Sequence, residues 1–406
     1  MNELVAKYYF EANGVSATQA VRQIMAESSI GTWTELQTLD TRMQKRLGPR
    51  ALKYSKTTGT VEIAYPIDLF EPRNIPQLLS GLAGNIFGMK IVKNLRLLDI
   101  KFPKKYVKNF KGPKFGFHGV RKILGIKKRP VLGTIIKPKV GLSPIEFANV
   151  AYKAYSGGLD FVKDDENLTS LRFCKFEDRV IKMLDVVDRI KEEQGRNVLY
   201  AANVTAPTRI MLKRADFVYA HGGRCIMIDI LTAGFSALQE LRSQNYKMVI
   251  HAHRAGHASV TRNKKHGISM YLIAKLSRLI GVDQLHIGTA VGKMEGQVKE
   301  VLAIKDIIQK DHVRVKGYLS QDWYKIYPVF AVASGGLHPR LVPEVIKIMG
   351  KDIVIQAGGG VHGHPGGTKA GAKAMKQALD AAMDGVPLKI YAKTHKELRD
   401  ALRRWP

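Results

Sequence analysis

Short apolar runs rich in β-branched residues recur through the last two thirds of the chain. Eight can be distinguished, with most starts 23 to 45 residues apart, at residues 131–136, 159–162, 198–204, 225–230, 248–253, 284–288, 329–334 and 353–358. Runs of this length and composition predict buried strands. The intervals carry the apolar spacing of amphipathic helices at residues 147–155, 179–192, 237–242, 269–279, 342–349 and, after the last run, 370–383. Eight alternations of strand and helix predict an α/β protein with a C-terminal (β/α)8 TIM barrel.

Residues 1–118 precede this pattern and indicate a separate N-terminal α+β domain of the ferredoxin-like kind. Strands are predicted at residues 5–10, 61–66 and 95–100, and helices at 17–26 and 75–83. The stretch at Gly112-Pro113 and residues 119–130 is rich in glycine, proline and charge, which predicts a connecting segment. The barrel domain then takes residues 119–406.

Polar side chains follow most of the predicted barrel strands directly. They are Lys137 and Lys139, then Lys163, Asp165 and Glu166, then Asn203, then His253, Arg254 and His257, then His286, then Ser334, Gly335 and Gly336, and last Gly358, Gly359 and Gly360. In barrels of this kind the active site is built from the C-terminal ends of the strands. The distribution therefore predicts an active site at that end.

The segment GGLDFVKDDEN (157–167) is the most informative of these strand ends. Lysine, aspartate and glutamate are seldom fully buried without partners. Asp165 and Glu166 offer the oxygen ligands that Mg²⁺ prefers. Lys163 cannot bind a cation as an ammonium, but a desolvated amine that CO₂ converts to a carbamate would be an anionic oxygen ligand. The alternative is a salt-bridged strand end with a solvated acidic loop, and the clustering of polar residues at the other strand ends favours the site.

Two glycine-rich loops predict phosphate binding. Ser334-Gly335-Gly336 follows the seventh strand and Gly358-Gly359-Gly360 the eighth, where barrels commonly hold phosphate through backbone N–H groups. Glycine permits the close approach and the positive φ that such loops need. Arg254 and His286 could hold a second phosphate, so a substrate phosphorylated at both ends fits the layout.

Two further segments carry candidate chemistry. In HAHRAGH (251–257), His251 and His253 share one face of the strand and could chelate a metal, but we favour polar contacts and proton transfer, with His251 packed in the barrel interior. The loop GTAVGKMEG (288–296) is bracketed by glycines and carries Lys293, which is typical of a mobile lid. A surface loop with a solvated lysine is the alternative.

Composition narrows the class of protein. Of 406 residues, 45% are hydrophobic, and no run of 18 or more apolar residues occurs, so we expect no membrane span. Residues 1–10 lack the apolar core of a signal peptide. The two cysteines, Cys174 and Cys225, lie in separate parts of the predicted barrel, so no disulfide is expected. These features predict a cytoplasmic protein.

The net charge of the chain is +30, and the positive charge is most concentrated in residues 90–129. This stretch contains fourteen lysines and arginines and one acidic residue, Asp99. Such a stretch could bind nucleic acid, steer a polyanionic substrate, or reflect a host with basic proteins. No aromatic RNA platform, zinc knuckle or helix-turn-helix pattern accompanies it. We therefore expect no nucleic-acid partner, and a nucleic-acid-binding protein without enzymatic activity is the remote alternative.

Several long motifs occur in the order of one known family. They are GTIIKPKVGLS (133–143), GGLDFVKDDEN (157–167), HAHRAGHA (251–258), LHIGTAVGKMEG (285–296), VASGGLH (332–338) and QAGGGVHGHPGG (356–367), with ESSIGTW (27–33) and GNIFG (84–88) before them. The chain resembles the large subunit of ribulose-1,5-bisphosphate carboxylase/oxygenase, RuBisCO. The resemblance covers nearly the whole chain.

The resemblance implies a role for each polar residue at the centre of the site. Lys163, carbamylated by a CO₂ that is not the substrate, would hold Mg²⁺ together with Asp165 and Glu166. The carbamate would take the C3 proton of ribulose 1,5-bisphosphate to form the enediolate. Lys137 would protonate the product carbanion, and His253 would serve the hydroxyl chemistry around C3.

The resemblance also implies how the substrate is bound. Lys139 would support Lys137, and Lys293 would close over the site and stabilise the developing carboxylate. Arg254, His286 and Ser334 would bind one phosphate. The remaining implied contacts are Gly335, Gly336, Gly358 and Gly359, with Glu27, Thr32, Trp33 and Asn85 supplied by a neighbouring subunit. A homodimer would be the least functional unit, with larger assemblies built from dimers.

Two branches of the family differ in activity. RuBisCO-like proteins act as enolases or isomerases in sulfur salvage and typically replace several of these residues, whereas this chain keeps Lys293, Lys137, Lys139 and the N-terminal set. A true carboxylase, which also oxygenates its substrate, is therefore favoured. The sequence ends at 402–406 without a long tail, which is similar to the archaeal-type form III that works without small subunits and is linked to nucleoside monophosphate salvage. Gly256 and Gly366 depart from the residues common in the family.

Overall fold

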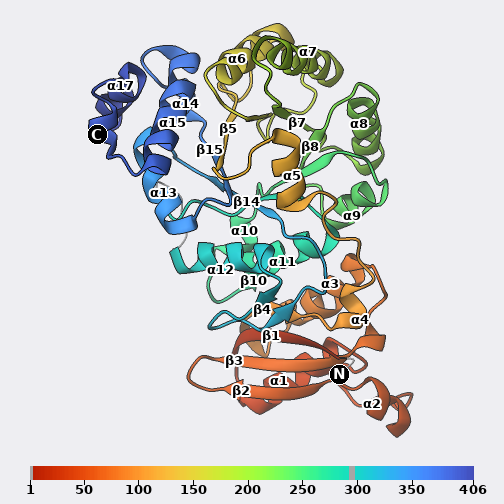
Figure 1. Cartoon of the computed structure of the whole chain (residues 1–406). Helices are drawn as coiled ribbons and strands as arrows, with labels where there is room; N and C mark the ends of the chain where they lie inside the picture. Colours follow the sequence, from red (N-terminus) through yellow and green to blue (C-terminus); the bar gives the residue numbers. More distant parts are fainter. Residues whose placement is uncertain (1–2, 292–297) are drawn as a thin grey trace. The chain divides into compact units, whose positions relative to one another are not determined.

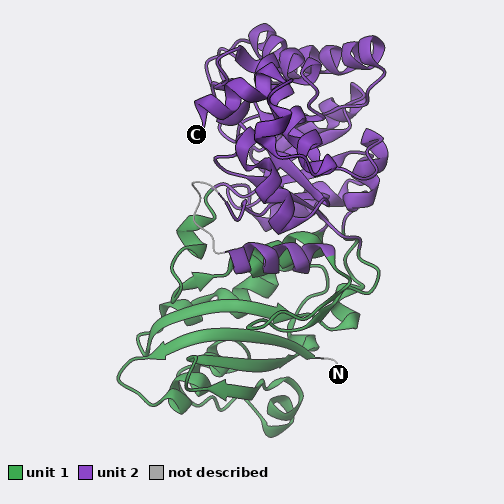
Figure 2. Ribbon diagram, turned by 60° about the vertical axis from the view of Figure 1, so that its left-hand side comes forward, with its two compact units in different colours: residues 1–112, 256–280, 310–326 green, residues 113–255, 281–309, 327–406 purple. Residues whose placement is uncertain are grey.

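The structure is a computed structural model that describes residues 3–291 and 298–406 (Figure 1). Contacts divide the chain into two compact units (Figure 2). The first contains residues 1–112, 256–280 and 310–326, and the second contains residues 113–255, 281–309 and 327–406. Two segments that follow barrel strands in the sequence thus belong to the first unit. The single boundary expected at residue 118 stays a prediction.

A mixed five-stranded sheet forms the centre of the first unit. Its order is β10-β4-β1-β3-β2, with β1 antiparallel to β3 and β4, and β10 parallel to β4. The strands are β1 Glu3–Ala12, β2 Arg50–Ser55, β3 Thr60–Pro66, β4 Val92–Lys101 and β10 Gly267–Ile268. Strand β1 alternates between buried and partly exposed positions, because one face packs on the core. Leu4, Ala6 and Tyr8 are on that buried face.

The helices of the first unit begin at recognisable caps. Helix α1 (Ala17–Glu27) starts at Ser16, whose hydroxyl accepts from the N–H of Gln19 while the Gln19 side chain accepts from Ser16, a capping box. The other elements are α2 Thr41–Leu47, η1 Ile67–Leu69, α3 Ile75–Ala83, η2 Asn85–Gly88, α4 Lys104–Val107, α10 Ala258–Thr261, α11 Met270–Ile280, β12 His312–Val313 and β13 Gln321–Asp322. Both predicted N-terminal helices and all three predicted strands are confirmed.

The second unit is a closed barrel of eight parallel strands, which confirms the predicted fold class. The order around the barrel is β11-β14-β15-β5-β6-β7-β8-β9. The strands are β5 Val131–Ile135, β6 Phe161–Lys163, β7 Leu199–Asn203, β8 Cys225–Asp229, β9 Val249–His253, β11 Gln284–His286, β14 Phe330–Ser334 and β15 Ile353–Gln356. Each of the eight apolar runs overlaps one of these strands.

Helices alternate with the barrel strands. They are α5 Gly116–Leu124, α6 Pro144–Ser156, α7 Phe176–Gln194, α8 Thr208–Ala220, α9 Phe235–Ser243, α12 Val298–Gln309, η3 Pro339–Leu341, α13 Val342–Met349, α14 Gly359–His362, α15 Gly367–Asp384, α16 Leu388–Tyr391 and α17 Lys396–Arg404. No helix in the described ranges is both long and apolar enough to cross a membrane. Cys174 and Cys225 are free and buried.

Helix α5 corrects the expectation that residues 119–130 only connect two domains. Val120 and Leu124, one helical turn apart, are buried in a cluster with the first residues of several strands, among them Val131 and Val249. The helix ends at Gly125, whose φ of 70° gives a left-handed C-cap. Phe117 and Ile123 of the same helix also pack against this cluster, so α5 closes the N-terminal end of the barrel. The glycines and charged residues of the segment hid this apolar face in the sequence.

Candidate active site

Lys163 is the last residue of β6, and its side chain is 1% exposed. Its Nζ donates to the backbone oxygen of Asp164 at 2.8 Å and to Sδ of Met227 at 3.4 Å, while Oε2 of Glu166 lies 3.9 Å away. Burial lowers the pKa of Lys163, because water no longer stabilises the ammonium, and the carboxylates nearby only partly offset this. The site therefore raises the fraction of the neutral amine, which is the form that reacts with CO₂.

Asp164 fixes the segment in place. Its Oδ2 accepts from Nη2 of Arg179 at 3.1 Å and from the backbone N–H of Asn203 at 2.8 Å, and its Oδ1 accepts from the Tyr200 hydroxyl at 2.8 Å. The Asp164 and Arg179 side chains are both fully buried. The Asp164 carboxylate is fully hydrogen-bonded within the protein. It thereby anchors the segment so that the next two residues, Asp165 and Glu166, face the barrel mouth.

Asp165 is paired with a lysine from the adjacent strand. Its Oδ2 lies 2.7 Å from Nζ of Lys137, which follows β5 by two residues, and its Oδ1 accepts from the N–H and the side-chain amide of Asn167. Burial acts to raise the pKa of Asp165, but the contacts with Lys137 and Asn167 leave it below its usual value. The carboxylate is therefore ionised at neutral pH.

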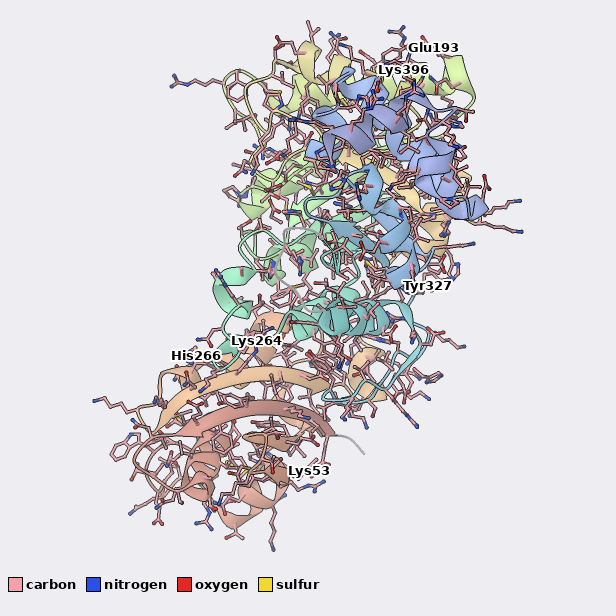
Figure 3. The ribbon with its side chains drawn as sticks, turned by 90° about the vertical axis from the view of Figure 1, so that its left-hand side faces the viewer. Lys53, Glu193, Lys264, His266, Tyr327 and Lys396 are labelled. Atoms are coloured by element: carbon pink, nitrogen blue, oxygen red, sulfur yellow. The ribbon has the colours of Figure 1, made fainter. Side chains whose placement is uncertain are left out.

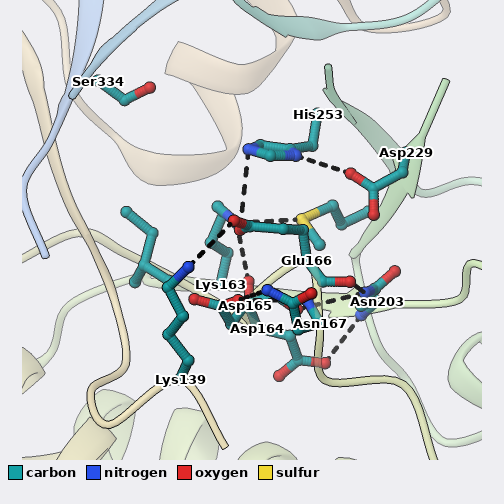
Figure 4. Close-up of polar contacts among 12 residues, drawn as sticks. Lys139, Lys163, Asp164, Asp165, Glu166, Asn167, Asn203, Asp229, His253 and Ser334 are labelled. Carbon is teal, nitrogen blue, oxygen red and sulfur yellow. Dashed lines mark hydrogen bonds and ion pairs between the residues drawn. The ribbon is translucent and has the colours of Figure 1, made fainter. Parts of the chain in front are cut away.

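Glu166 lies among three nitrogen groups without a close contact to any of them (Figure 4). Nζ of Lys163 and of Lys139 are each 3.9 Å from its carboxylate, and Nε2 of His253 is 3.8 Å away. The backbone oxygen of Glu166 accepts from the Asn203 amide at 3.2 Å. Glu166 thus has a fixed backbone and a carboxylate that remains available to a ligand.

His253 ends β9 and is held by Asp229, the last residue of β8. Nδ1 of His253 and Oδ1 of Asp229 are 2.7 Å apart. Because the carboxylate accepts, Nδ1 carries a hydrogen, and Nε2 faces the Glu166 carboxylate at 3.8 Å. This arrangement suits the proton transfer expected of His253.

The donor set of this cluster fits a divalent cation only if Lys163 takes part. No group of three or more histidines, cysteines, aspartates and glutamates in the described residues could hold a metal ion. Asp165 and Glu166 supply two carboxylates, and a hard cation requires further oxygen ligands. A carbamate on the buried amine of Lys163 would supply the third anionic ligand.

A chain of hydrogen bonds crosses the barrel interior beside the site. Oε1 of Gln284 is 2.6 Å from Nδ1 of His251, Nε2 of His251 is 2.8 Å from Nε2 of His286, and Nδ1 of His286 is 2.6 Å from Oγ of Ser334. Burial lowers the pKa of both histidines well below the usual value, so the rings are neutral. His251 is packed in the interior as expected. Both nitrogens of His286 are engaged within the protein.

Only the first glycine loop has the positive φ that was expected of both. Gly335 and Gly336 have φ angles of 123° and 70°, which residues other than glycine rarely adopt. Gly358 has a φ of −89°, and the two glycines after it are the first residues of α14. A Cβ on Gly358 would lie 3.1 Å from Cε of Lys137, so this glycine leaves room for the lysine stem. Ser334, at the end of β14, begins the first of these loops.

Arg254 follows His253 and remains charged although it is largely removed from water. Burial lowers the pKa of Arg254 to about 10, and Glu300 opposes this change. A Cβ on Gly288, where φ is 95°, would lie 3.2 Å from Nη2 of Arg254. The glycine after β11 therefore makes space for the guanidinium, which is suited to bind phosphate.

The comparison with known proteins agrees with this geometry. Residues 116–405 match the catalytic domain of the ribulose bisphosphate carboxylase large chain, and residues 1–106 match its N-terminal domain. The chain belongs to the RuBisCO large chain family.

Archaeal RuBisCOs are among its similar relatives. The chain is 52% identical over 402 residues to the ribulose bisphosphate carboxylase of Methanocaldococcus jannaschii, covering 97% of this chain and 95% of the relative. It is 51% identical over 408 residues to that of Pyrococcus abyssi, covering 100% and 93%. The resemblance to archaeal members is confirmed.

Solved structures of archaeal RuBisCOs share the fold throughout. The octameric enzyme from Pyrococcus horikoshii, in complex with sulfate, has a TM-score of 0.93 at 50% identity and covers 99% of this chain and 93% of its own. The dimeric enzyme from Hyperthermus butylicus has a TM-score of 0.94 at 47% identity, with coverage of 100% and 96%.

The four N-terminal residues expected to serve a neighbouring RuBisCO subunit gather within the first unit. Glu27, Trp33 and Asn85 line one hollow of about 1150 Å³, and the hydroxyl of Thr32 donates to Glu27 at 2.9 Å. Trp33 is 78% exposed, which is unusual for a tryptophan. A large apolar ring in contact with water suits a surface that another chain covers.

The site in the structure differs in part from the set of site residues predicted from the sequence. Lys293 lies outside the described residues. Asp229 and Gln356 were not predicted, although each ends a barrel strand, and both amide atoms of Gln356 are buried without a hydrogen-bond partner in the described ranges. The signal that marked the other residues, a polar side chain at the end of an apolar run, would have found both.

Proposed function

We propose that the protein is a ribulose-bisphosphate carboxylase that adds CO₂ to ribulose 1,5-bisphosphate and yields 3-phosphoglycerate, with oxygenation of the same substrate as a side reaction. Two relatives that are 52% and 51% identical, matched over 95% and 93% of their own length, carry the name ribulose bisphosphate carboxylase. The observation that supports the assignment most is the buried amine of Lys163 beside Asp165 and Glu166 at the ends of the barrel strands.

Lys163, Asp165 and Glu166 would hold Mg²⁺, with CO₂ bound as a carbamate on Lys163. When bound, the cation supplies Lewis-acid stabilisation of the negative charge that develops on the sugar. The fit rests on the lowered pKa of Lys163 and on a Glu166 carboxylate that no protein cation contacts closely in the described residues.

Lys137 and His253 would move protons. Asp165 holds the Lys137 ammonium at 2.7 Å, so its Nζ is oriented to donate a proton to the product carbanion. Asp229 orients His253 so that Nε2 accepts protons from the substrate hydroxyls. Lys139, 3.9 Å from Glu166, would support this arrangement from a more exposed position.

The two phosphates of the substrate would bind at separate loops. Arg254, His286 and Ser334 would contact one phosphate; for a direct contact His286 must exchange its bond to His251 or Ser334. Gly335, Gly336, Gly358 and Gly359 would offer backbone N–H groups.

The minimal assembly would be a homodimer, with larger assemblies built from dimers and no small subunit. Glu27, Thr32, Trp33 and Asn85 would complete the site of the neighbouring subunit, and Lys293 would close over the substrate. The octameric and dimeric relatives from Pyrococcus horikoshii and Hyperthermus butylicus support this assignment. A role in nucleoside monophosphate salvage belongs to the same proposal.

The decisive experiment is incubation with ribulose 1,5-bisphosphate, Mg²⁺ and labelled bicarbonate. We expect acid-stable label in 3-phosphoglycerate, and no label without Mg²⁺. Consumption of a sulfur-salvage substrate without incorporation of label would instead identify a RuBisCO-like enolase or isomerase.

A further inference from the structure

The C-terminal helix α17 packs against α15 and against the 3-10 helix η3, which continues the loop after β14 (Figure 1). Leu398 and Ala401 are buried in this contact. The helix therefore lies close to one of the two glycine loops, although none of its residues belongs to the site described above.

His364 ties the start of α17 to the loop that follows β15. Its Nδ1 accepts from the N–H of Gly366 at 2.9 Å, and its Nε2 is 2.9 Å from the backbone oxygen of Glu397. A carbonyl only accepts, so Nε2–H donates, and one neutral tautomer satisfies both contacts. The His364 side chain is buried, so the link is removed from competing water.

Trp405 extends the contact past the end of the helix. Its N–H donates to the backbone oxygen of Ala401 at 3.0 Å, which fixes the residue on the last turn. Its ring stacks on His338, with centroids 5.4 Å apart and planes 15° apart. A Cβ on Gly363 would lie 3.7 Å from Cζ2 of Trp405. The Trp405 side chain thus stacks on a residue that follows the first glycine loop and lies beside one that follows the second.

The two loops also touch each other at this place. A Cβ on Gly360 would lie 2.1 Å from the backbone oxygen of Leu337 and 2.6 Å from Cα of His338, so only glycine fits. Nδ1 of His338 is buried and finds no hydrogen-bond partner in the described part of the chain. Cα and Cβ of His338 therefore lie against Gly360, and its ring stacks on Trp405.

We infer that Trp405 is a positioning residue that holds the loops 334–338 and 358–363 together and thereby sets the affinity of the site for phosphate. The inference rests on the proposed function, in which both loops bind the substrate. Removal of the ring would let His338 move away from Gly360, which would separate the N–H groups of Gly335 and Gly336 from those of Gly358 and Gly359. The groups around Lys163 are on other strands, so the chemical step should change little.

The test compares Trp405→Ala, Trp405→Leu and Trp405→Phe, with Arg404→Ala on the exposed end of α17 as the control. For the alanine and leucine variants we expect the KM for ribulose 1,5-bisphosphate, and the Kd of inorganic phosphate measured by calorimetry, to rise about three- to tenfold, the range that a lost aromatic pair accounts for. The kcat of these variants should stay within about twofold of the wild-type value. In Trp405→Phe and Arg404→Ala, the KM and the Kd should also stay within about twofold of the wild-type values.

Four outcomes would overturn the inference, and three of them concern the variants. The first is an unchanged KM and Kd in Trp405→Ala, and the second is a lower kcat at constant KM in the same variant. The third is that both the alanine and the leucine variant unfold, because Trp405 would then serve stability only. Wild-type protein that binds no inorganic phosphate would also refute it. If the wild type binds phosphate more tightly than Trp405→Ala but fixes no CO₂, the proposed function fails and the positioning role stands.

Discussion

At the scale of single residues, the site depends on a lysine that the fold keeps from water. A buried ammonium is costly unless it is paired, and the carboxylate of Glu166 is 3.9 Å from Nζ of Lys163. Burial thus makes it easier for Lys163 to lose its proton next to two carboxylates. The proposed carbamate depends on this combination, because the strand end would act as a cation site only after CO₂ had reacted.

Lys163→Ala should abolish carboxylation and weaken Mg²⁺ binding in the presence of CO₂, because the third anionic ligand is lost. Calorimetric titration with Mg²⁺, with and without bicarbonate, measures the binding, and labelled bicarbonate measures turnover. Lys182→Ala, an exposed position on α7, is the matched control and should behave as the wild type. Near-normal carboxylation by Lys163→Ala would refute the carbamate assignment.

Arg179→Met should lower the free energy of unfolding by about 3–5 kcal/mol, because it leaves the buried Asp164 carboxylate without its charged partner. Urea denaturation measures this change. Arg189→Met, in the exposed pair with Glu193, is the control and should leave the stability close to that of the wild type. Equal effects of the two substitutions would contradict the anchoring role of Asp164.

At the scale of elements, the C-terminal helix adds a pH-dependent contribution to stability. The Glu397 carboxylate accepts from Gln377 at 2.9 Å and from Lys373 at 3.3 Å, and these contacts lower the pKa of Glu397 from 4.5 to about 2. A lowered pKa means that the folded state binds fewer protons than the unfolded state. The stabilisation is present above about pH 4.5 and is lost as the pH falls towards 2.

Glu397→Gln should therefore flatten the decline of Tm with acid. Thermal unfolding of the wild type and the variant between pH 5 and 3 measures the difference, with Glu192→Gln on the exposed face of α7 as the control. Parallel curves for wild type and Glu397→Gln would show that the contacts of Glu397 do not contribute.

At the scale of the whole molecule, the N-terminal hollow and the barrel site predict active sites shared between chains. Co-expression of Glu27→Ala and Lys163→Ala chains should restore about a quarter of wild-type activity, because half of the dimers are mixed and each contains one intact site. Co-expression of Lys163→Ala with Asp165→Ala should restore none, since both changes affect the barrel. Inactive mixed dimers in the first experiment, or a fully active monomer, would contradict shared sites.

The positive charge of the molecule should act mainly on the capture of substrate. Charged side chains surround the ribbon of each unit, Lys53 and Lys396 among them (Figure 3). In the basic stretch 90–129, Lys104, Lys105 and Lys108 are exposed, whereas Arg96 and Arg121 are buried in structural contacts. The exposed charge can attract a bisphosphate from a distance. Salt weakens this attraction, because the screening length is only about 8 Å at physiological ionic strength.

We therefore expect kcat/KM for ribulose 1,5-bisphosphate to fall as salt rises while kcat changes little. Steady-state kinetics from low to high salt measures both. A flat kcat/KM would show that the charge does not steer the substrate. Tight, salt-resistant binding of a particular RNA sequence would instead support a nucleic-acid partner.

The sequence by itself determined the elements and the class of site. Strand composition, helical spacing and turn residues are properties of short windows, so the eight barrel strands and the polar residues at their ends could be located without the fold. The motifs at 157–167 and 356–367 likewise pointed to the family. Helix α5 was missed because glycines and charged residues hid its apolar face, and the partners of Val120 and Leu124 are strand residues that come later in the chain.

Only the tertiary structure decided what each charged residue does. Asp164, Asp165 and Glu166 are consecutive, yet the first is neutralised by Arg179, the second is paired with Lys137, and the third stays available. Burial, pKa and hydrogen-bond partners depend on groups from other strands and helices, which no local pattern specifies. The same reason explains why the contact of Asp229 with His253 and the stacking of Trp405 on His338 could be seen only in the tertiary structure.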